Sequence, residues 1–417
     1  MNALPPLLCA ALLTILLAAC GGEPASKSAT NLSTPALRGS ISPNLATGPD
    51  GQIILSWIAP NGDGHALRYA QLGKAGWTKP GTVSRGDDWF VNWADFPSVV
   101  PLSDSLWAAH WLRSQPAGGY AYDVIVSLSE DKGASWSQSF MPHTDGTPTE
   151  HGFVTLFPDP NEIGIVWLDG RKMVNEFDAN DVTSSGMTLR AATFGADQLP
   201  IREALVDELV CDCCQTDVAL TSEGPIVVYR NRTTAEVRDI YVSRRANGEW
   251  QEGVRVAADD WNIAACPVNG PIIMARNNLV AVAWFTAANN QPLVKAAWSM
   301  DGGRTFLTPL TLNDTVPLGH IAAVMLESGE VVVAWQHSVG GGAELLMRRA
   351  SVDGELGDVH IVSEAQNVFA FSVPQIALHD DALILAWTES VGKQYSVQTA
   401  RLPIDSLPRL RNRVTPP

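Results

Sequence analysis

The chain has 417 residues, of which 46% are hydrophobic and only 17% are charged, so it can bury a large core. Its formal net charge is −16 at pH 7, which argues against nucleic acid as a partner and against a basic lipid-binding surface. The length alone does not require two domains, because single β domains often exceed the usual domain size.

The first 19 residues are typical of a signal peptide. Leu7–Ala19 is apolar but too short to hold a stable membrane span. The run Leu17-Ala18-Ala19-Cys20-Gly21 resembles a bacterial lipobox. That resemblance implies cleavage before Cys20, lipid on its sulfur, and sorting to the outer membrane, facing the periplasm or the exterior. Residues 20–37 are rich in Ser, Thr, Ala and Pro and are predicted to form a flexible tether.

Seven strand-sized apolar runs follow, and each ends in an aromatic residue. The aromatics are Trp57, Trp111, Trp167, Tyr229, Trp284, Trp335 and Trp387. Turn residues precede each run, and alternating strands follow it. A repeat of this size predicts an all-β chain, a β-propeller of four-stranded antiparallel blades, with seven blades favoured and six as the alternative.

The predicted propeller spans residues 38–405 as a single domain, and residues 406–417 form a C-terminal tail. The seventh unit lacks a fourth strand of its own. We expect the N-terminal segment around Ala36–Ser42 to supply that strand, because ring closure removes an exposed edge.

Two units share the motif S-x-D-x-G-x-x-[W/F]. Its residues are Ser129, Asp131, Gly133, Trp136, Ser299, Asp301, Gly303 and Phe306. The Asp can bond the amides of its turn, Gly supplies the backbone angle, and the aromatic plugs the turn into the blade. With these motifs, the region Pro43 to Leu402 resembles the Asp-box (BNR-repeat) β-propellers of the sialidase-like superfamily. The resemblance implies a structural role for the motif and an activity on glycans.

Antiparallel blades place the short hairpins on one face, and the inter-blade links and 2–3 loops on the other. We call the second the link face. It receives the carboxylates Asp95, Glu150 and Asp169, which are candidates for catalysis by a carboxylate pair. Sialidases of the family use an arginine triad to hold a carboxylate. The matching candidates are Arg171, Arg230, Arg232 and Arg238, while Trp93 and Trp261 are candidate sugar platforms.

Cys211, Cys213, Cys214 and Cys266 would remain after removal of the signal peptide and lipidation of Cys20. Disulfides among these four cysteines are one interpretation, since exported thiols commonly pair. The alternative is a copper or zinc site, because soft thiolate ligands and imidazole suit these metals. Its candidate ligands open the first strands of units 3 to 6: His151, Cys213, Cys214, Cys266 and His320.

The sequence therefore predicts a monomeric, lipid-anchored propeller in the cell envelope that touches the membrane only through its lipid. It would act on, or bind, a glycan or a small anionic ligand at one face of the central channel, as a sialidase-like glycoside hydrolase or a non-catalytic carbohydrate-binding module. A metal-binding or thiol-redox protein that uses the Cys/His cluster is the alternative.

Overall fold

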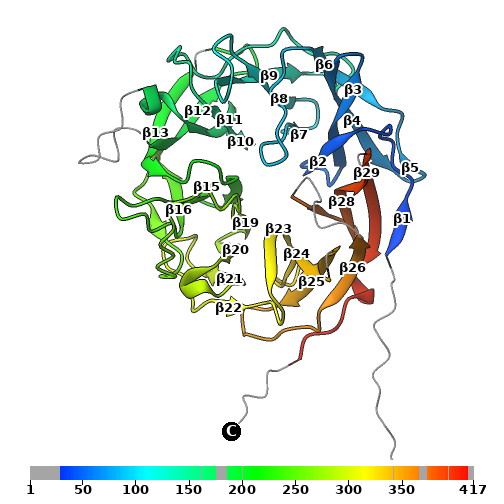
Figure 1. Ribbon diagram of the computed structural model, residues 1–417, viewed down its shortest axis with the longest axis vertical. Helices are drawn as coiled ribbons and strands as arrows, with labels where there is room; N and C mark the ends of the chain where they lie inside the picture. The colour runs from blue at the N-terminus through cyan, green and yellow to red at the C-terminus, as the bar shows by residue number, and fades with distance from the viewer. Residues whose placement is uncertain are drawn as a thin grey trace, which may run out of the picture.

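The computed structural model describes residues 29–160, 162–174, 186–199, 201–340, 342–365, 373–392 and 394–411. Cys20 and the predicted signal peptide lie outside these ranges. The described part of the chain forms a ring of seven antiparallel blades, a seven-bladed β-propeller (Figure 1). The prediction of seven blades is confirmed.

Each blade starts at the centre of the ring and runs outward. The inner strands are β2 (Ile41–Thr47), β7 (Ser98–Pro101), β10 (His151–Asp159), β14 (Asp217–Thr221), β19 (Ile272–Arg276), β23 (Pro317–Met325) and β27 (Gln375–His379). The second strands are β3 (Ile53–Asn61), β8 (Trp107–Ser114), β11 (Glu162–Asp169), β15 (Gly224–Arg230), β20 (Leu279–Thr286), β24 (Val331–Val339) and β28 (Ala382–Val391).

The third strands are β4 (Gly64–Gly73), β9 (Tyr122–Ser129), β12 (Met187–Phe194), β16 (Ile240–Ala246), β21 (Leu293–Ser299), β25 (Gly342–Ala350) and β29 (Gln394–Pro403). The outer strands are β5 (Gly76–Trp77), β6 (Gly81–Gly86), β13 (Arg202–Val210), β17 (Glu249–Trp250), β18 (Val254–Arg255), β22 (Leu310–Thr311), β26 (His360–Ala365) and β1 (Thr30–Leu32). In blade 2 the described outer edge is a single bridge between Val126 and Phe140.

Helical structure is limited to short 3-10 turns in the described residues: η1 (Arg171–Val174), η3 (Ala288–Asn290) and η4 (Ile404–Ser406). Within these ranges no helix has the length and hydropathy to cross a bilayer.

The recurring aromatics pack each blade onto the one before it. Trp284 of blade 5 clusters with Ile226 and Val228 of blade 4, and the same arrangement recurs around the ring. Trp57 of blade 1 packs on Ala386 of blade 7, which carries the arrangement across the closure. A large ring buried at each interface explains why the aromatics repeat at the spacing of the blades.

The ring closes through the N-terminal segment, but not through the residues predicted for it. Strand β1 (Thr30–Leu32) pairs with β29 and completes blade 7 (Figure 1). The predicted segment Ala36–Ser42 instead contains a turn, with Gly39 at φ +87°, and the first two residues of β2, to which that turn carries the chain inward. A chain that leaves the outer edge of one blade needs such a link to reach the inner strand of the next. Within the predicted C-terminal tail, Arg411 forms a single bridge with Leu356.

The two S-x-D-x-G-x-x-[W/F] turns have matching hydrogen bonds. Asp131 accepts bonds from the backbone N–H and the hydroxyl of Ser135, at 2.8 and 2.6 Å. Asp301 accepts the equivalent pair from Thr305, at 2.9 and 2.6 Å. The glycine of each turn has a positive φ, which most side chains resist. These turns therefore stabilise the hairpins on the face opposite the link face.

Candidate functional site

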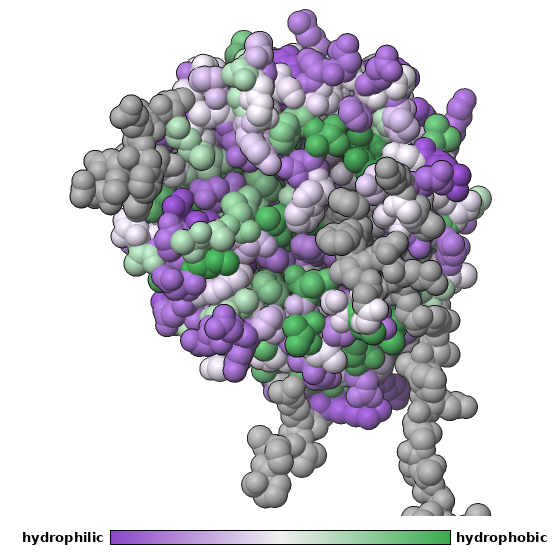
Figure 2. Space-filling view, viewed as in Figure 1, coloured by the Kyte–Doolittle hydropathy of each residue, from purple (hydrophilic) through white to green (hydrophobic). Residues whose placement is uncertain are grey.

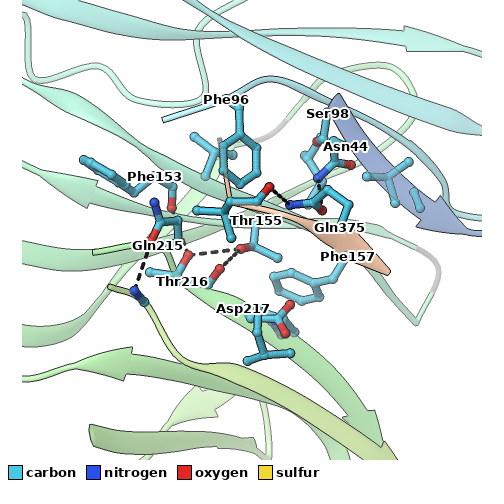
Figure 3. A pocket seen from close by; sticks show the side chains of 18 of the residues that line it. Asn44, Phe96, Ser98, Phe153, Thr155, Phe157, Gln215, Thr216, Asp217 and Gln375 are labelled. Atoms are coloured by element: carbon cyan, nitrogen blue, oxygen red, sulfur yellow. Dashed lines mark hydrogen bonds between the residues drawn. The ribbon is translucent and has the colours of Figure 1, made fainter. Parts of the chain in front are cut away.

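A cavity of about 330 Å³ lies at the centre of the ring, and all seven blades contribute to its wall. Its neutral hydrogen-bonding side chains are Asn44, Thr47, Ser98, Thr155, Gln215, Thr216 and Gln375, and Phe96, Phe153 and Phe157 add aromatic surface. In Figure 3, Asn44, Ser98 and Gln375 lie on one side of this space, and Gln215, Thr216 and Asp217 lie on the other.

Hydrogen bonds between blades hold these polar side chains in place. The Asn44 amide donates to the Gln375 Oε1 across the ring closure, at 3.3 Å. The Thr155 hydroxyl donates to the backbone oxygen of Thr216, at 2.9 Å, and joins blades 3 and 4. The Gln215 amide donates at 2.6 Å to a carbonyl before β7 and accepts at 3.0 Å from an N–H before β19. The cavity is therefore formed before any ligand enters it.

The cavity has two carboxyl groups and, among the described residues that line it, no Arg, Lys or His. Burial raises the pKa of Asp95 to about 8, although a backbone hydrogen bond from Phe153 opposes the shift. Burial likewise raises the pKa of Asp217 to about 7, against two backbone hydrogen bonds. Near neutral pH the Asp95 carboxyl therefore keeps its proton, and the cavity wall carries little charge.

Asp95 belongs to a chain of three acidic groups that leads toward the link face. The Tyr122 hydroxyl lies 3.1 Å from the Asp95 Oδ2 and 2.7 Å from the Glu150 Oε1. One phenolic proton cannot serve two carboxylates, so protonated Asp95 donates to Tyr122, which donates to Glu150. Gly152 is required beside them, because a Cβ there would lie 1.9 Å from Asp95.

A second buried polar cluster lies between blades 2 and 3. The rings of His143 and His151 stack, with centroids 4.1 Å apart, and both contact the Asp145 carboxylate. Asp169 accepts two 2.7 Å bonds from the Arg171 guanidinium. Burial opposes charge on His151, but its hydrogen bond to Asp145 and the charge of Asp169 raise its pKa above the ordinary value.

The protonation of these imidazoles follows from their partners. The His143 Nε2 accepts a bond from the Val124 N–H, so its proton sits on Nδ1, which faces Asp145. The His151 Nδ1 faces the carbonyls of Tyr122 and Thr149, while its Nε2 faces Asp145. Only an imidazolium can donate to both sides, so His151 is charged.

Metal binding does not suit this cluster as it stands. Ligand atoms of Asp145, His151 and Asp169 lie within 4.8 Å of one another, close enough for a metal centre. However, Arg171 contacts both carboxylates, at 3.4 Å for Asp145 and 2.7 Å for Asp169. Its guanidinium and the charged His151 already supply the positive charge that a metal would bring.

The other candidate arginines are also occupied. Arg232 and Arg238 both bind the Glu236 carboxylate, at 2.6 and 2.9 Å, and both approach Asp212. Arg230 is buried and donates to three backbone carbonyls, and its guanidinium carbon lies 4.9 Å from the centre of the Trp261 ring. These arginines therefore stabilise the loops of blade 4 and do not form an open carboxylate-binding triad.

The cysteines divide into two pairs. Cys213 and Cys266 form a disulfide, as one of the two sequence interpretations expected. Cys211 and Cys214 are free, buried thiols with their sulfurs 2.7 Å apart. Of the predicted metal ligands, Cys213 and Cys266 are therefore not available as thiolates in this form.

His320 opens blade 6, as predicted, beside Trp93, with ring centroids 5.4 Å apart. Its Nδ1 bonds Gln336, at 2.9 Å. Its φ is +50°, and Ser42 and Phe153 have positive φ at the corresponding β-bulges of β2 and β10. Non-glycine residues seldom adopt this conformation, which concentrates at functional sites. The strained bulges lie at the link-face ends of inner strands, next to the cavity.

The structure brings together only part of the predicted site. Asp95 reaches the cavity and Glu150 joins it through Tyr122, whereas Asp169 and Arg171 lie in the separate histidine cluster. Sequence analysis missed Tyr122, Asp217 and the neutral cavity side chains. The only sequence feature that could have identified Tyr122 and Asp217 is their position at the start of a strand, since Asp217 opens β14 and Tyr122 opens β9.

Comparison with known proteins gives no match to a protein-family model or to a curated sequence. Among solved structures, the chain is similar to NanB with optactamide, at 13% identity over 88% of this chain and 68% of that one, with a TM-score of 0.47. It is also similar to the alpha-L-arabinanase of Penicillium chrysogenum with arabinobiose, at 10% identity over 91% of this chain and 98% of that one, with a TM-score of 0.48. A third similar structure is the leech intramolecular trans-sialidase with 2,7-anhydro-Neu5Ac, at 12% identity over 88% of this chain and 68% of that one, with a TM-score of 0.46.

At such identities, and with TM-scores below 0.5, these similarities carry no argument about activity. The chain is a seven-bladed β-propeller with a preformed, nearly uncharged polar cavity on its axis.

Proposed function

We propose that the propeller binds a neutral, polyhydroxylated ligand, such as a sugar unit of a glycan, in its central cavity. The observation that carries this proposal is the composition of the cavity wall: amides, hydroxyls, two carboxyls and aromatic rings, with no basic side chain among the described residues. The volume of about 330 Å³ is within the usual range for small-molecule pockets.

The chemistry of the wall matches a sugar better than an anion. Asn44 and Gln375 offer amide groups, and Thr155 and Thr216 offer hydroxyls, which can donate to and accept from sugar hydroxyls. An anionic ligand such as sialic acid would meet no cation among the described residues that line the cavity. The arginines that sequence analysis assigned to a carboxylate are neutralised by Asp and Glu or bound to backbone carbonyls.

The same geometry favours binding over hydrolysis by a carboxylate pair. Asp95 and Glu150 both lie within 3.1 Å of the Tyr122 hydroxyl, so their oxygens are at most about 6 Å apart, close to the roughly 5–5.5 Å of retaining glycosidases. However, the Tyr122 side chain fills the space between them and is fully buried. A substrate cannot lie between the two carboxyl groups, so we assign Asp95 to ligand binding.

The binding test compares sugars and variants by saturation-transfer NMR and calorimetry. Neutral mono- and disaccharides should bind to the wild-type protein, and sialyllactose should bind no better than its neutral lactose part. Asn44→Ala and Gln375→Ala should each weaken binding about fivefold, since a lost hydrogen bond costs about 1 kcal/mol.

The matched control is Gln138→Ala, which changes an exposed residue outside the cavity wall. If the cavity variants bind the same sugars as tightly as Gln138→Ala does, the site lies elsewhere. If only the sialylated sugar binds, the preference for neutral ligands is wrong.

We also propose that the propeller is tethered by lipid on Cys20, which would place the cavity outside the cytoplasm. The lipobox-like run before Cys20 supports this. Cys20→Ser should abolish incorporation of labelled palmitate and release the protein from the membrane fraction. Cys9→Ser, within the predicted signal peptide, is the matched control and should change neither. Unchanged labelling of Cys20→Ser would contradict the tether.

A further inference from the structure

Two cysteine pairs of opposite redox state lie next to each other on the link face. The Cys213–Cys266 disulfide joins the link before β14 to the link before β19, and Cys266 is exposed to solvent. Cys211 and Cys214 are almost fully buried, and their sulfurs are 2.7 Å apart, within about 0.7 Å of an S–S bond length. A small movement would therefore join them.

The sulfurs of the two pairs are also close to each other. Those of Cys211, Cys213 and Cys214 all lie within 4.8 Å of one another. The buried dithiol is thus beside the Cys213 sulfur of the disulfide, and Cys266, at the other end of the disulfide, is an exposed residue.

The surroundings of Cys211 favour a thiolate, the form that attacks disulfides. The Arg238 Nη1 donates to the Cys211 sulfur at 3.5 Å. Burial opposes ionisation of Cys211, but its contact with Cys214 and the charges of Arg230 and Arg238 lower its pKa to about 7. Burial raises the pKa of Cys214, so Cys211 is the attacking group.

We propose that the four cysteines form an internal thiol–disulfide relay, in which the buried dithiol and the exposed disulfide exchange their redox states. This proposal does not rest on the proposed binding of sugar. The relay needs no external oxidant, because the disulfide already present accepts the two electrons.

The exchange proceeds in two balanced steps. The Cys211 thiolate attacks the Cys213 sulfur, forming the Cys211–Cys213 bond and breaking the Cys213–Cys266 bond. The electron pair leaves on Cys266, which takes up the proton that Cys211 gave. Cys214 then attacks the Cys211 sulfur and releases Cys213 as a thiol, so the products are a Cys211–Cys214 disulfide and a Cys213/Cys266 dithiol.

The exchange would present the exposed dithiol to other thiols or disulfides of the envelope. It would also free the link before β19 from its covalent bond to the link before β14. Gln215, which lines the cavity, bonds the Gly270 N–H of that freed link at 3.0 Å.

The test traps the exposed thiol in folded, full-length protein that carries one disulfide per molecule. Such protein is purified anaerobically without reductant, and mass spectrometry first confirms that Cys213–Cys266 is its disulfide and that Cys211 and Cys214 are thiols. Iodoacetamide is added to the folded protein, the protein is then denatured, and a second, mass-distinct alkylator marks the remaining thiols. The relay predicts that Cys266 takes the first label over time, while the Cys211–Cys214 disulfide accumulates, as mapped by mass spectrometry.

Two variants serve as controls, each checked for wild-type circular dichroism. Cys211→Ser removes the attacking sulfur and should slow the labelling of Cys266 at least about tenfold. Arg238→Gln keeps every sulfur and should slow it less, so the test remains decisive if Cys211→Ser fails to fold. The relay is refuted if Cys266 in the wild type stays unlabelled until denaturation, or is labelled as fast in folded Cys211→Ser or Arg238→Gln.

Discussion

Asp169→Ala should lower the free energy of unfolding by about 3–5 kcal/mol, because it breaks a buried ion pair from one side. The Asp169 side chain is fully buried and accepts 2.7 Å bonds from Arg171 and from the indole N–H of Trp167. Its Oδ2 is also 3.8 Å from the His151 Nε2. Removal of the carboxylate leaves the Trp167 N–H without its acceptor, and it takes from the largely buried Arg171 guanidinium its two shortest hydrogen bonds, so that only Asp145 and Glu203 remain beside it.

Urea unfolding followed by far-ultraviolet circular dichroism measures this loss as a shift in the midpoint. Asp381→Ala is the matched control: its side chain is 88% exposed and pairs with Arg401, so it should cost less than about 1 kcal/mol. Asp169→Asn should fall between the two, since the amide keeps one acceptor. Equal losses in the free energy of unfolding for Asp169→Ala and Asp381→Ala would show that the histidine cluster does not stabilise the packing of blade 2 against blade 3.

Asp95→Asn should stabilise the protein at alkaline pH and change little near pH 4. Burial raises the pKa of Asp95 from 3.8 to about 8, so between these values the folded state holds a proton that the unfolded state has lost. The free energy of unfolding of the wild type therefore falls as the pH rises from about 4 to about 8. The loss from Asp95 is on the order of 5 kcal/mol, and above about pH 8 this group causes no further loss. The amide of the Asp95→Asn variant would mimic the protonated acid, accepting from Phe153 and donating to Tyr122.

Urea midpoints measured from pH 4 to pH 9 show this effect as a difference between variant and wild type that grows with pH and levels off near pH 8. Asp217→Asn is the comparison, because its pKa is raised to about 7 and its difference should level off one unit lower. A difference for Asp95→Asn that stays constant with pH would mean that Asp95 is ionised in the folded protein. A gain in stability together with weaker sugar binding would identify Asp95 as a group kept for function.

The sequence predicted the fold because its determinants are periodic. An aromatic at the end of each second strand packs on the preceding blade, so one packing rule is repeated in all seven units. The closing strand was misplaced because Thr30–Leu32 is short and carries no hydrophobic pattern, whereas the apolar residues nearby belong to β2.

For the candidate site, the sequence predicted only which loops carry its residues. Asp95, Glu150, Asp169 and Arg171 all lie near the link face, but which of them meet depends on distances between blades that spacing does not give. Arginines in the expected loops suggested an anion site, yet their Asp and Glu partners neutralise them. The sequence did not identify Tyr122 as a site residue, because an aromatic residue at the start of a strand has the same sequence pattern as an ordinary core residue.

The most direct test of the account is a crystal structure of the protein soaked with the neutral saccharide that binds best in solution. We expect sugar density in the central cavity, within hydrogen-bonding distance of Asn44, Gln375 or Asp95. Density only on the outer face of the blades, or an unoccupied cavity at saturating sugar, would contradict it.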